Sequence, residues 1–381
     1  MNAFCLRELH LWLEFVLFPM PALTTKNNTI LVTGANGFVA SWVIDTLLKR
    51  GYTVRAAVRT EVKGQYILEQ FKSYSETGKI QVVAVGDIAK ETAFDDAVKD
   101  VDGIIHTASP VHLGSGEPSA IIEPAVNGTL GILKSALKFG YVASKVIDYC
   151  SNKASASDRV SVKRIIVTSS CAAVKERQET RTNIDETSWN ESSIVECEEK
   201  GKNAHPLDMY SASKTIAEKR EAGAYECAWE FVAEHASEIK WDFVVITPPW
   251  IFGPPLQEVT SVETLNSSNM YWYKAVFEGN FFGANPETDP AHGWIDVRDA
   301  AEAHARALEE PTAGGERIIV CAGSPWVWQD FCDISQGIDP KIHSIGNTFN
   351  TAKEHSILGL EYRTMKEMTD DTLAYITKKG W

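Results

Sequence analysis

The sequence predicts an α/β fold in which helices cover both faces of a mainly parallel, doubly wound β-sheet. From Thr29 onward, short β-branched runs alternate with amphipathic segments, as expected for successive βαβ units. A glycine-rich turn follows the first of these runs. A length of 381 residues, 44% of them hydrophobic, leaves room for one large domain and a smaller appended one.

Strands and helices are expected in a regular order along the chain. The strands are predicted at Thr29–Thr33, Thr53–Val58, Ile80–Val85, Gly103–Thr107, Arg164–Thr168 and Phe243–Thr247. The helices are predicted at Phe38–Arg50, Ile121–Phe139 and Met209–Ala236. Apolar spacing indicates the first helix, and Gly51 suits its C-terminal cap. The third is predicted from its content of Ala, Glu and Lys.

Two segments fall outside this alternation. Residues 1–27 are predicted to be an N-terminal extension outside the fold, because charged side chains interrupt their apolar run, and no stable membrane span is expected. A weak interfacial helix is the alternative, and Met20 begins a second plausible start of the domain. Residues 141–162 are predicted to be an insertion at the edge of the sheet, with a candidate helix at Val142–Tyr149.

The charge and the cysteine content argue against several classes of protein. A formal net charge of −14 disfavours nucleic acid as a partner, whereas backbone N–H groups can still hold an anionic cofactor. The seven cysteines are odd in number and include no C-x-x-C pair, so neither a disulfide framework nor a zinc site is expected. A reducing compartment, and hence the cytoplasm, fits this pattern best.

The glycine-rich turn predicts a dinucleotide-binding site. Gly34 permits a tight turn, Gly37 lets the backbone approach a pyrophosphate, and Ala40 allows close packing of helix on strand. The free N–H groups of the following helix would then face the phosphates. An ordinary strand–helix corner is the alternative. The expected cofactor contacts in this turn are Thr33, Gly34, Asn36, Gly37, Phe38 and Val39.

The ends of the second and third strands bear on the choice of cofactor. Arg59 stands where NAD-binding proteins use a carboxylate for the ribose 2′-hydroxyl, and a guanidinium there pairs with the 2′-phosphate of NADP(H). The alternative is a solvated arginine neutralised by Glu61. Asp87, with Ile88, is placed to accept a hydrogen bond from an adenine amino group, or to cap an acidic helix that follows.

A tyrosine, a lysine and a serine predict a catalytic group. Tyr210 and Lys214 lie four residues apart, on one face of a helix, where an ammonium is expected to lower the pKa of a phenol. Ser170 follows a strand at the edge of the sheet where open α/β sheets bind ligands, and its hydroxyl can donate to a substrate oxygen. The alternative for Ser169 and Ser170 is a turn whose hydroxyls cap the backbone.

Taken in order, these motifs resemble the extended short-chain dehydrogenase/reductases. Within them, the chain is similar to the group of dihydroflavonol reductases, cinnamoyl-CoA reductases and fungal aldehyde, ketone and methylglyoxal reductases. The segment from Tyr210 to Glu218 resembles the fungal NADPH-dependent reductases most. Lys175 replaces an asparagine that binds substrate in dihydroflavonol reductases, which argues against a flavonoid. The other motifs that carry the resemblance are Val54-Arg-Ala-Ala-Val-Arg59, Ile105-His-Thr-Ala-Ser109, Val126-Asn-Gly128, Asp185-Glu-Thr-Ser-Trp189-Asn190, Tyr210-Ser-Ala-Ser-Lys214-Thr-Ile-Ala-Glu218 and Trp294-Ile-Asp-Val-Arg-Asp299.

The resemblance implies a Rossmann domain over residues 28–250, to which 294–322 return, and a substrate-binding domain formed by 251–293 and 323–381. It implies that Ser170, Tyr210 and Lys214 are catalytic, with Tyr210 and Lys214 also touching the cofactor. We therefore expect reduction of a small aldehyde or ketone with NADPH by a monomer or homodimer. The resemblance adds as cofactor contacts Thr107, Ala108, Ser109 and Pro248.

Other functions remain open at this point. An NAD-dependent nucleotide-sugar epimerase or dehydratase, or a hydroxysteroid dehydrogenase, would use the same scaffold, although Arg59 argues against tightly held NAD. A non-catalytic NADP-sensing regulator is disfavoured by the tyrosine–lysine pair. Aromatic residues after position 249 predict either an apolar wall for a bulky substrate or a small hydrophobic core between the lobes. They are Trp250, Phe252, Tyr271, Trp272, Tyr273, Phe277, Phe281 and Phe282.

Overall fold

A computed structural model describes residues 22–23, 27–109, 116–140, 162–176, 183–219, 226–289, 293–339 and 348–381. The insertion expected at 141–162, apart from Val162, and the helix expected within it lie outside the described residues, as does nearly all of the N-terminal extension. Within the described ranges, no helix combines the length and the apolar character needed to cross a bilayer.

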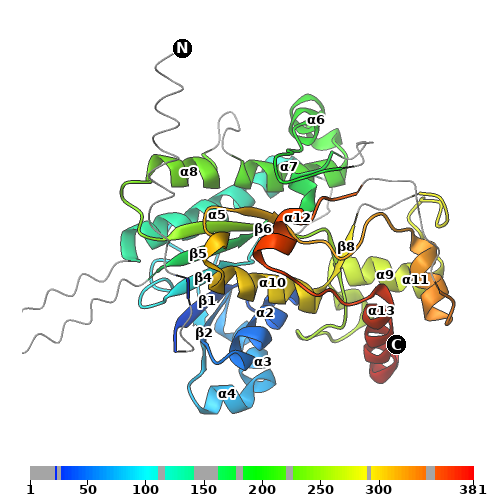
Figure 1. The fold of residues 1–381 in the computed structure, drawn as a ribbon, viewed down its shortest axis with the longest axis horizontal. Helices are drawn as coiled ribbons and strands as arrows, with labels where there is room; N and C mark the ends of the chain where they lie inside the picture. Colours follow the sequence, from blue (N-terminus) through cyan, green and yellow to red (C-terminus); the bar gives the residue numbers. More distant parts are fainter. Residues whose placement is uncertain are drawn as a thin grey trace, which may run out of the picture.

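A seven-stranded sheet forms the centre of the fold (Figure 1), and every neighbouring pair of its strands is parallel. From edge to edge the strands are β3 (Ile80–Ala84), β2 (Thr53–Val58), β1 (Thr29–Thr33), β4 (Gly103–His106), β5 (Arg164–Thr168), β6 (Asp242–Thr247) and β9 (Arg317–Ile319). The strand order reverses between β1 and β4, and open parallel sheets bind ligands beyond the carboxyl ends of the strands at such a reversal. The predicted doubly wound parallel sheet is confirmed.

Helices cover both faces of this sheet. Figure 1 shows α5, α7 and α8 above the sheet and α2, α3 and α10 below it. Two hydrophobic cores result, one on each face, and β4 and β6 are buried along their whole length. The helices around the sheet are α2 (Phe38–Lys49), α3 (Glu61–Gln70), α4 (Lys72–Glu76), α5 (Ser119–Phe139), α6 (Ser192–Lys200), α7 (Pro206–Glu218), α8 (Ala228–Glu234), α10 (Val297–Glu309) and α12 (Ala352–Ile357).

The single helix predicted over Met209–Ala236 is wrong. The structure has α7 and α8 in its place, and the backbone of Lys219 is extended directly after α7, with φ −60° and ψ 160°. Its composition of good helix formers is a weak indicator that tertiary contacts override. Here the last residue of α7, Glu218, is buried in an ion pair with Arg317, a tertiary contact that the composition of the segment does not reveal.

The prediction that the extension lies outside the fold is wrong at Leu23. This side chain is fully buried in the core below the sheet, where its Cδ1 atom lies over Gly103. Its N–H donates to the Leu308 carbonyl at 3.0 Å, and its carbonyl accepts from the Tyr52 hydroxyl at 2.7 Å. An apolar side chain with both backbone groups satisfied is therefore part of the domain.

A separate, smaller core lies beside the sheet and is built mainly from aromatic residues. It is enclosed by α9 (Ser267–Glu278), α11 (Trp328–Ser335) and α13 (Met365–Lys379), which group on the right of Figure 1, and by the two-stranded sheet of β7 (Trp250–Phe252) and β8 (Trp294–Asp296). Phe252 and Trp272 are fully buried there, so for these two the small-core interpretation holds. Phe277 and Phe282 are 45% exposed, and both lie at its edge.

The chain also returns from this smaller core to the sheet. Leu358 and Leu360, in the segment expected to belong to the substrate-binding domain, pack into the core below the sheet. Strand β8, expected to belong to the Rossmann domain, pairs with β7 in the smaller sheet instead. The strands β7, β8 and β9 were not predicted, because runs of three residues carry too little periodicity to be recognised.

Candidate functional site

The glycine turn after β1 has a geometry that only glycine fits. Gly34 adopts a positive φ of +64°, and a Cβ atom at this position would lie 3.0 Å from the Cα of Ala108. The N–H of Gly37 donates to the Gly34 carbonyl at 2.8 Å, which closes the turn. The chain leaving β4 therefore passes directly against the turn, at the point where the strand order reverses.

The start of α2 offers donors to an anion. Gly37 is the N-cap residue, and it has no side chain to accept hydrogen bonds from the first turn of the 12-residue helix. These N–H groups and the positive end of the helix dipole are suited to a pyrophosphate. Phe38 is buried, Val39 is half-buried and Asn36 is exposed beside them. The residues present thus fit a dinucleotide.

Threonine side chains hold the exit of β4 against the turn. The Thr107 hydroxyl donates to the Thr33 carbonyl at 2.6 Å, and the Thr33 hydroxyl accepts from the N–H of Ala108 at 3.2 Å. Ser109 is half-buried one residue further along and lines a small cavity together with Lys214. The structure therefore brings Thr33, Thr107, Ala108 and Ser109 together between the glycine turn and Lys214.

Arg55 in β2 and Arg59 just after it differ in their hydrogen bonds and in their exposure to solvent. Arg55 donates to the carbonyls of Ala97, at 2.9 Å, and Lys99, so its guanidinium is already used. Arg59 lies just beyond β2 with an exposed side chain. An exposed guanidinium at this strand end is suited to a phosphate at the ribose.

The residues after β3 lie nearby, but the helix expected to follow them is wrong. Residues 88–100 form turns, and the Asp87 carboxylate accepts from the N–H of Ala89 at 3.1 Å. Ile88 is half-buried against Gly128 of α5. Asp87 is exposed, which leaves its second carboxylate oxygen accessible to a ligand.

Ser170, Tyr210 and Lys214 come together at the carboxyl end of β5. The Ser170 hydroxyl lies close enough to the Tyr210 phenol to lower the pKa of that phenol. The Lys214 ammonium lies 6.0 Å from the centre of the Tyr210 ring, since both residues are on α7, one turn apart. Pro206 at the first turn of α7 sets the start of this helix. Residues forty positions apart in sequence thus form one polar cluster.

The end of β5 holds Ser170 in place. The N–H of Ser169 donates to the Ile246 carbonyl at 2.8 Å, and that of Cys171 to the Pro248 carbonyl at 2.9 Å. The Ser170 hydroxyl accepts from the N–H of Ala172 at 3.1 Å and so caps the short 3₁₀ turn Cys171–Ala173. The capping role considered for Ser170 is real, and because the cap uses a lone pair of the oxygen, it does not occupy the Ser170 O–H.

Burial controls the ionisation of the tyrosine and the lysine. It raises the pKa of Tyr210 above its ordinary value, and the hydrogen bond from Ser170 acts in the opposite direction. The prediction that Lys214 lowers the pKa of Tyr210 below its ordinary value is therefore wrong. Burial lowers the pKa of Lys214 to about 8, against the effect of the Glu218 carboxylate, which raises it. At neutral pH the phenol keeps its proton and most of the lysine is charged.

The site contains three buried polar residues that the sequence prediction did not assign to it. Ser169 donates to one carboxylate oxygen of Glu218, and Arg317 donates to the other. All three side chains are buried, with exposed fractions below one tenth. Glu218 stands four residues after Lys214, a spacing that could have pointed to it, whereas nothing local marks Arg317, which is 99 positions away from Glu218.

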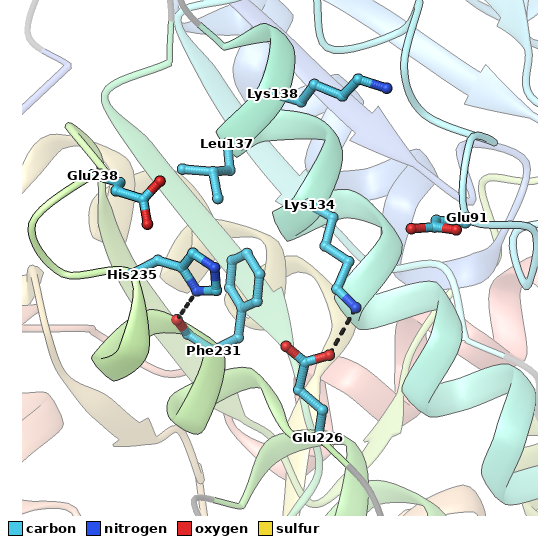
Figure 2. Close-up of a pocket in the computed structure, with 8 residues that line it drawn as sticks. All are labelled: Glu91, Lys134, Leu137, Lys138, Glu226, Phe231, His235 and Glu238. Carbon is cyan, nitrogen blue, oxygen red and sulfur yellow. Dashed lines mark hydrogen bonds and ion pairs between the residues drawn. The ribbon is translucent and has the colours of Figure 1, made fainter.

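A larger groove lies away from this cluster, between α5 and α8. Figure 2 shows its lining, in which Lys134 donates to Glu226 at 2.7 Å and the His235 ring is stacked on Phe231. None of the described residues that line it was predicted to bind cofactor or substrate. The groove also contains Lys138, Glu91 and Glu238. Among the described residues, it shares none of its lining with the small cavity beside Lys214.

Comparisons with known proteins agree with this geometry. Residues 30–323 match the NAD dependent epimerase/dehydratase family. The chain is 31% identical over 378 residues to an NADPH-dependent methylglyoxal reductase of Saccharomyces cerevisiae, covering 92% of this chain and 98% of the relative. It is 34% identical over 303 residues to the ketoreductase azaE of Aspergillus niger, covering 77% and 78% of the two chains.

A solved structure is similar over the same length. The crystal structure of the yeast methylglyoxal/isovaleraldehyde reductase complexed with NADPH superposes with a TM-score of 0.73. The two sequences are 29% identical there, and the match covers 92% of this chain and 99% of the other. The expected resemblance to the reductase group is confirmed by these matches.

Proposed function

We propose, on the premise that this chain belongs to the NAD dependent epimerase/dehydratase family, that it reduces an aldehyde or ketone to an alcohol with NADPH. The observation that carries the proposal is the cluster of Ser170, Tyr210 and Lys214 at the carboxyl edge of the sheet, beside the glycine turn. The names of the relatives, a methylglyoxal reductase and a ketoreductase, support the same reaction.

The cofactor would lie along the carboxyl edge of the sheet. The N–H groups at the start of α2 would hold its pyrophosphate, and Arg59 its 2′-phosphate. Asp87 and Ile88 would flank the adenine. The nicotinamide end would lie near Pro248, whose carbonyl is fixed beside Ser170, and near the segment Thr107–Ser109. When bound, NADPH supplies the hydride that forms the new C–H bond at the carbonyl carbon.

Residues of the chain then bind and protonate the carbonyl oxygen. Ser170 donates a hydrogen bond to it and orients it. Tyr210 transfers its phenolic proton to the oxygen as negative charge develops there, and its raised pKa ensures that the proton is present at neutral pH. The Lys214 ammonium stabilises the phenolate that remains and holds the ribose hydroxyls. A proton from solvent restores the phenol after the alcohol leaves.

The remaining parts of the molecule would serve this reaction. The lobe around the aromatic core, from 251–293 and 323–381, would form the wall for the substrate, and the segments 28–250 and 294–322 would bind the cofactor. The thiols of Cys171, Cys197, Cys321 and Cys332 are free and buried, which supports a reducing compartment such as the cytoplasm. The net charge of −14 supports a partner other than nucleic acid. A monomer or homodimer would suffice, since the cluster comes from one chain.

The test is NADPH oxidation by the purified chain, followed at the cofactor's absorbance band with a panel of aldehydes, diketones and ketoesters. NADH is run in parallel. We expect turnover with NADPH and at least one carbonyl class. Tightly bound NAD in the purified protein, with no oxidation of NADPH by any carbonyl, would contradict the proposal and favour a nucleotide-sugar epimerase or dehydratase.

A further inference from the structure

A buried carboxylate lies directly beneath the site. Glu218 is the last residue of α7, one helical turn after Lys214, and only 3% of its surface is exposed. One of its oxygens accepts from the Ser169 hydroxyl and the other from Nε of Arg317. The carboxylate therefore joins the helix that carries Tyr210 to the strand end that carries Ser170.

Arg317 extends this link to the backbone around Ser170. Its guanidinium stacks on Trp189 at 3.7 Å from the ring centre. It also donates to the Ser188 carbonyl at 2.7 Å and reaches the Ala173 carbonyl at 3.4 Å, in the 3₁₀ turn that Ser170 caps. A guanidinium held by this many acceptors is fixed in orientation, and so is the carboxylate bound to it.

The same carboxylate faces the lysine. Lys214, Glu218, Ser169 and His106 line one small cavity behind the site. His106, from β4, has its pKa lowered to about 3 by burial and by the charge of Lys214, so it is neutral at physiological pH. Tyr210 is neutral as well, since burial raises its pKa. The charged groups around Lys214 in the described structure are thus Glu218 and, behind it, Arg317.

We propose that Glu218 is a positioning residue for the reduction, which holds the Ser170 strand end against α7 and keeps Lys214 in its charged form. This inference rests on the proposed function. It assigns to Glu218 no contact with substrate or cofactor, since Ser169 and Arg317 occupy both of its oxygens. The pKa of Lys214 agrees with this role, because the Glu218 carboxylate raises it.

The consequence is a defined pH dependence. A lysine needed as an ammonium supports turnover below its pKa and loses that ability as the pH rises through about 8. Without the carboxylate, burial alone acts on Lys214, and its pKa falls. The alkaline limb of kcat/KM for the carbonyl at saturating NADPH should then move to lower pH, by about one unit or more.

The experiment compares two double variants. Glu218→Gln alone leaves the buried Arg317 guanidinium without its counter-charge, and this variant can fail to fold. Glu218→Gln is therefore combined with Arg317→Met, which removes both charges. The matched control combines Asp242→Asn with Arg164→Met, which removes the buried pair between β5 and β6. We expect the alkaline limb to move only in the first variant. If the alkaline limb lies at the same pH in both variants, the proposal is overturned and Glu218 is a purely structural residue.

A second measurement does not depend on turnover. The Cε chemical shift of Lys214, assigned by comparison with Lys214→Arg and titrated by NMR without cofactor, reports the lysine pKa directly. We expect a lower pKa in the Glu218→Gln/Arg317→Met variant than in the unmodified chain. If the unmodified chain reduces no carbonyl but this shift occurs, the proposed function fails while the effect of Glu218 on Lys214 stands. An unchanged pKa overturns the inference whatever the activity.

Discussion

Two buried arginine–carboxylate pairs, one between two strands and one between a strand and a helix, have the same chemistry and different surroundings. Arg164 and Asp242 are the first residues of the adjacent strands β5 and β6, joined by two hydrogen bonds of 2.6 Å, and Arg164 also donates to the Ala307 carbonyl. Arg317 and Glu218 join β9 to α7 next to Ser169. The first pair ties together backbone at the amino edge, whereas the second adjoins the site.

The position of a buried ion pair, at the amino edge of the sheet or beside the site, therefore determines whether it can affect turnover as well as stability. Both pairs have exposed fractions of less than one tenth, so both carry the desolvation penalty of buried charge. At the carboxyl edge, where ligands bind in such sheets, the Glu218 carboxylate raises the pKa of a residue of the site, Lys214. Variants at the two edges should therefore separate stability from turnover.

The largest expected separation comes from two tyrosines. Tyr210→Phe removes the proton donor and should lower kcat by about 10²- to 10⁴-fold, with NADPH affinity nearly intact. The matched control is Tyr52→Phe, which removes a hydroxyl bonded to the Leu23 carbonyl, away from the site. It should keep its turnover and lose about 1 kcal/mol of unfolding free energy. Steady-state kinetics, NADPH fluorescence titration and urea unfolding measure these quantities.

A joint loss of NADPH binding and folding in Tyr210→Phe would instead mark this residue as structural. Equal turnover in Tyr210→Phe and the unmodified chain would remove the phenol from the mechanism. Either outcome would end the functional distinction between the two edges of the sheet.

The second prediction concerns the pair at the amino edge. Asp242→Ala leaves the Arg164 guanidinium buried and unpaired, which should lower the unfolding free energy by about 3–5 kcal/mol. The kcat of the folded protein should stay unchanged, since neither residue adjoins the site. Urea unfolding monitored by circular dichroism measures the first quantity, and turnover at a temperature where the variant is folded measures the second. A loss of turnover with unchanged stability would reverse the assignment of this edge.

The same contrast explains how much could be predicted from the sequence. The glycine turn, the strands β1, β2 and β5, and the Tyr210–Lys214 spacing are local patterns, and the structure has them where they were expected. The division of the expected helix Met209–Ala236 into α7 and α8 was missed, because composition alone does not show where a helix ends. Arg317 was missed because its partner, Glu218, lies 99 positions away in the sequence. Contacts between distant positions decide these features, and no local pattern encodes them.

The third prediction addresses the choice of cofactor at the carboxyl edge. Arg59→Ala should remove a charge-assisted contact with the 2′-phosphate and reduce the preference for NADPH over NADH by about 10- to 100-fold. Arg55→Ala is the matched control, because this guanidinium is bonded to the Ala97 carbonyl and should affect stability rather than cofactor preference. The ratio of kcat/KM for the two cofactors is the measurement. An unchanged ratio in Arg59→Ala would place the 2′-phosphate contact elsewhere.

The smallest effect is expected in the glycine turn. Gly34→Ala forces a side chain into a backbone conformation with φ +64° and against Ala108 at 3.0 Å, so the turn must shift. Because strain of this kind is worth about 1–2 kcal/mol, we expect NADPH to bind about tenfold more weakly. Gly78→Ala is the matched control: it has a similar φ of +71° but open space around the added carbon, so it bears the strain without touching the cofactor turn. Fluorescence titration of NADPH should separate the two variants. Equal affinities would show that the turn tolerates a Cβ and that the pyrophosphate is held elsewhere along the carboxyl edge.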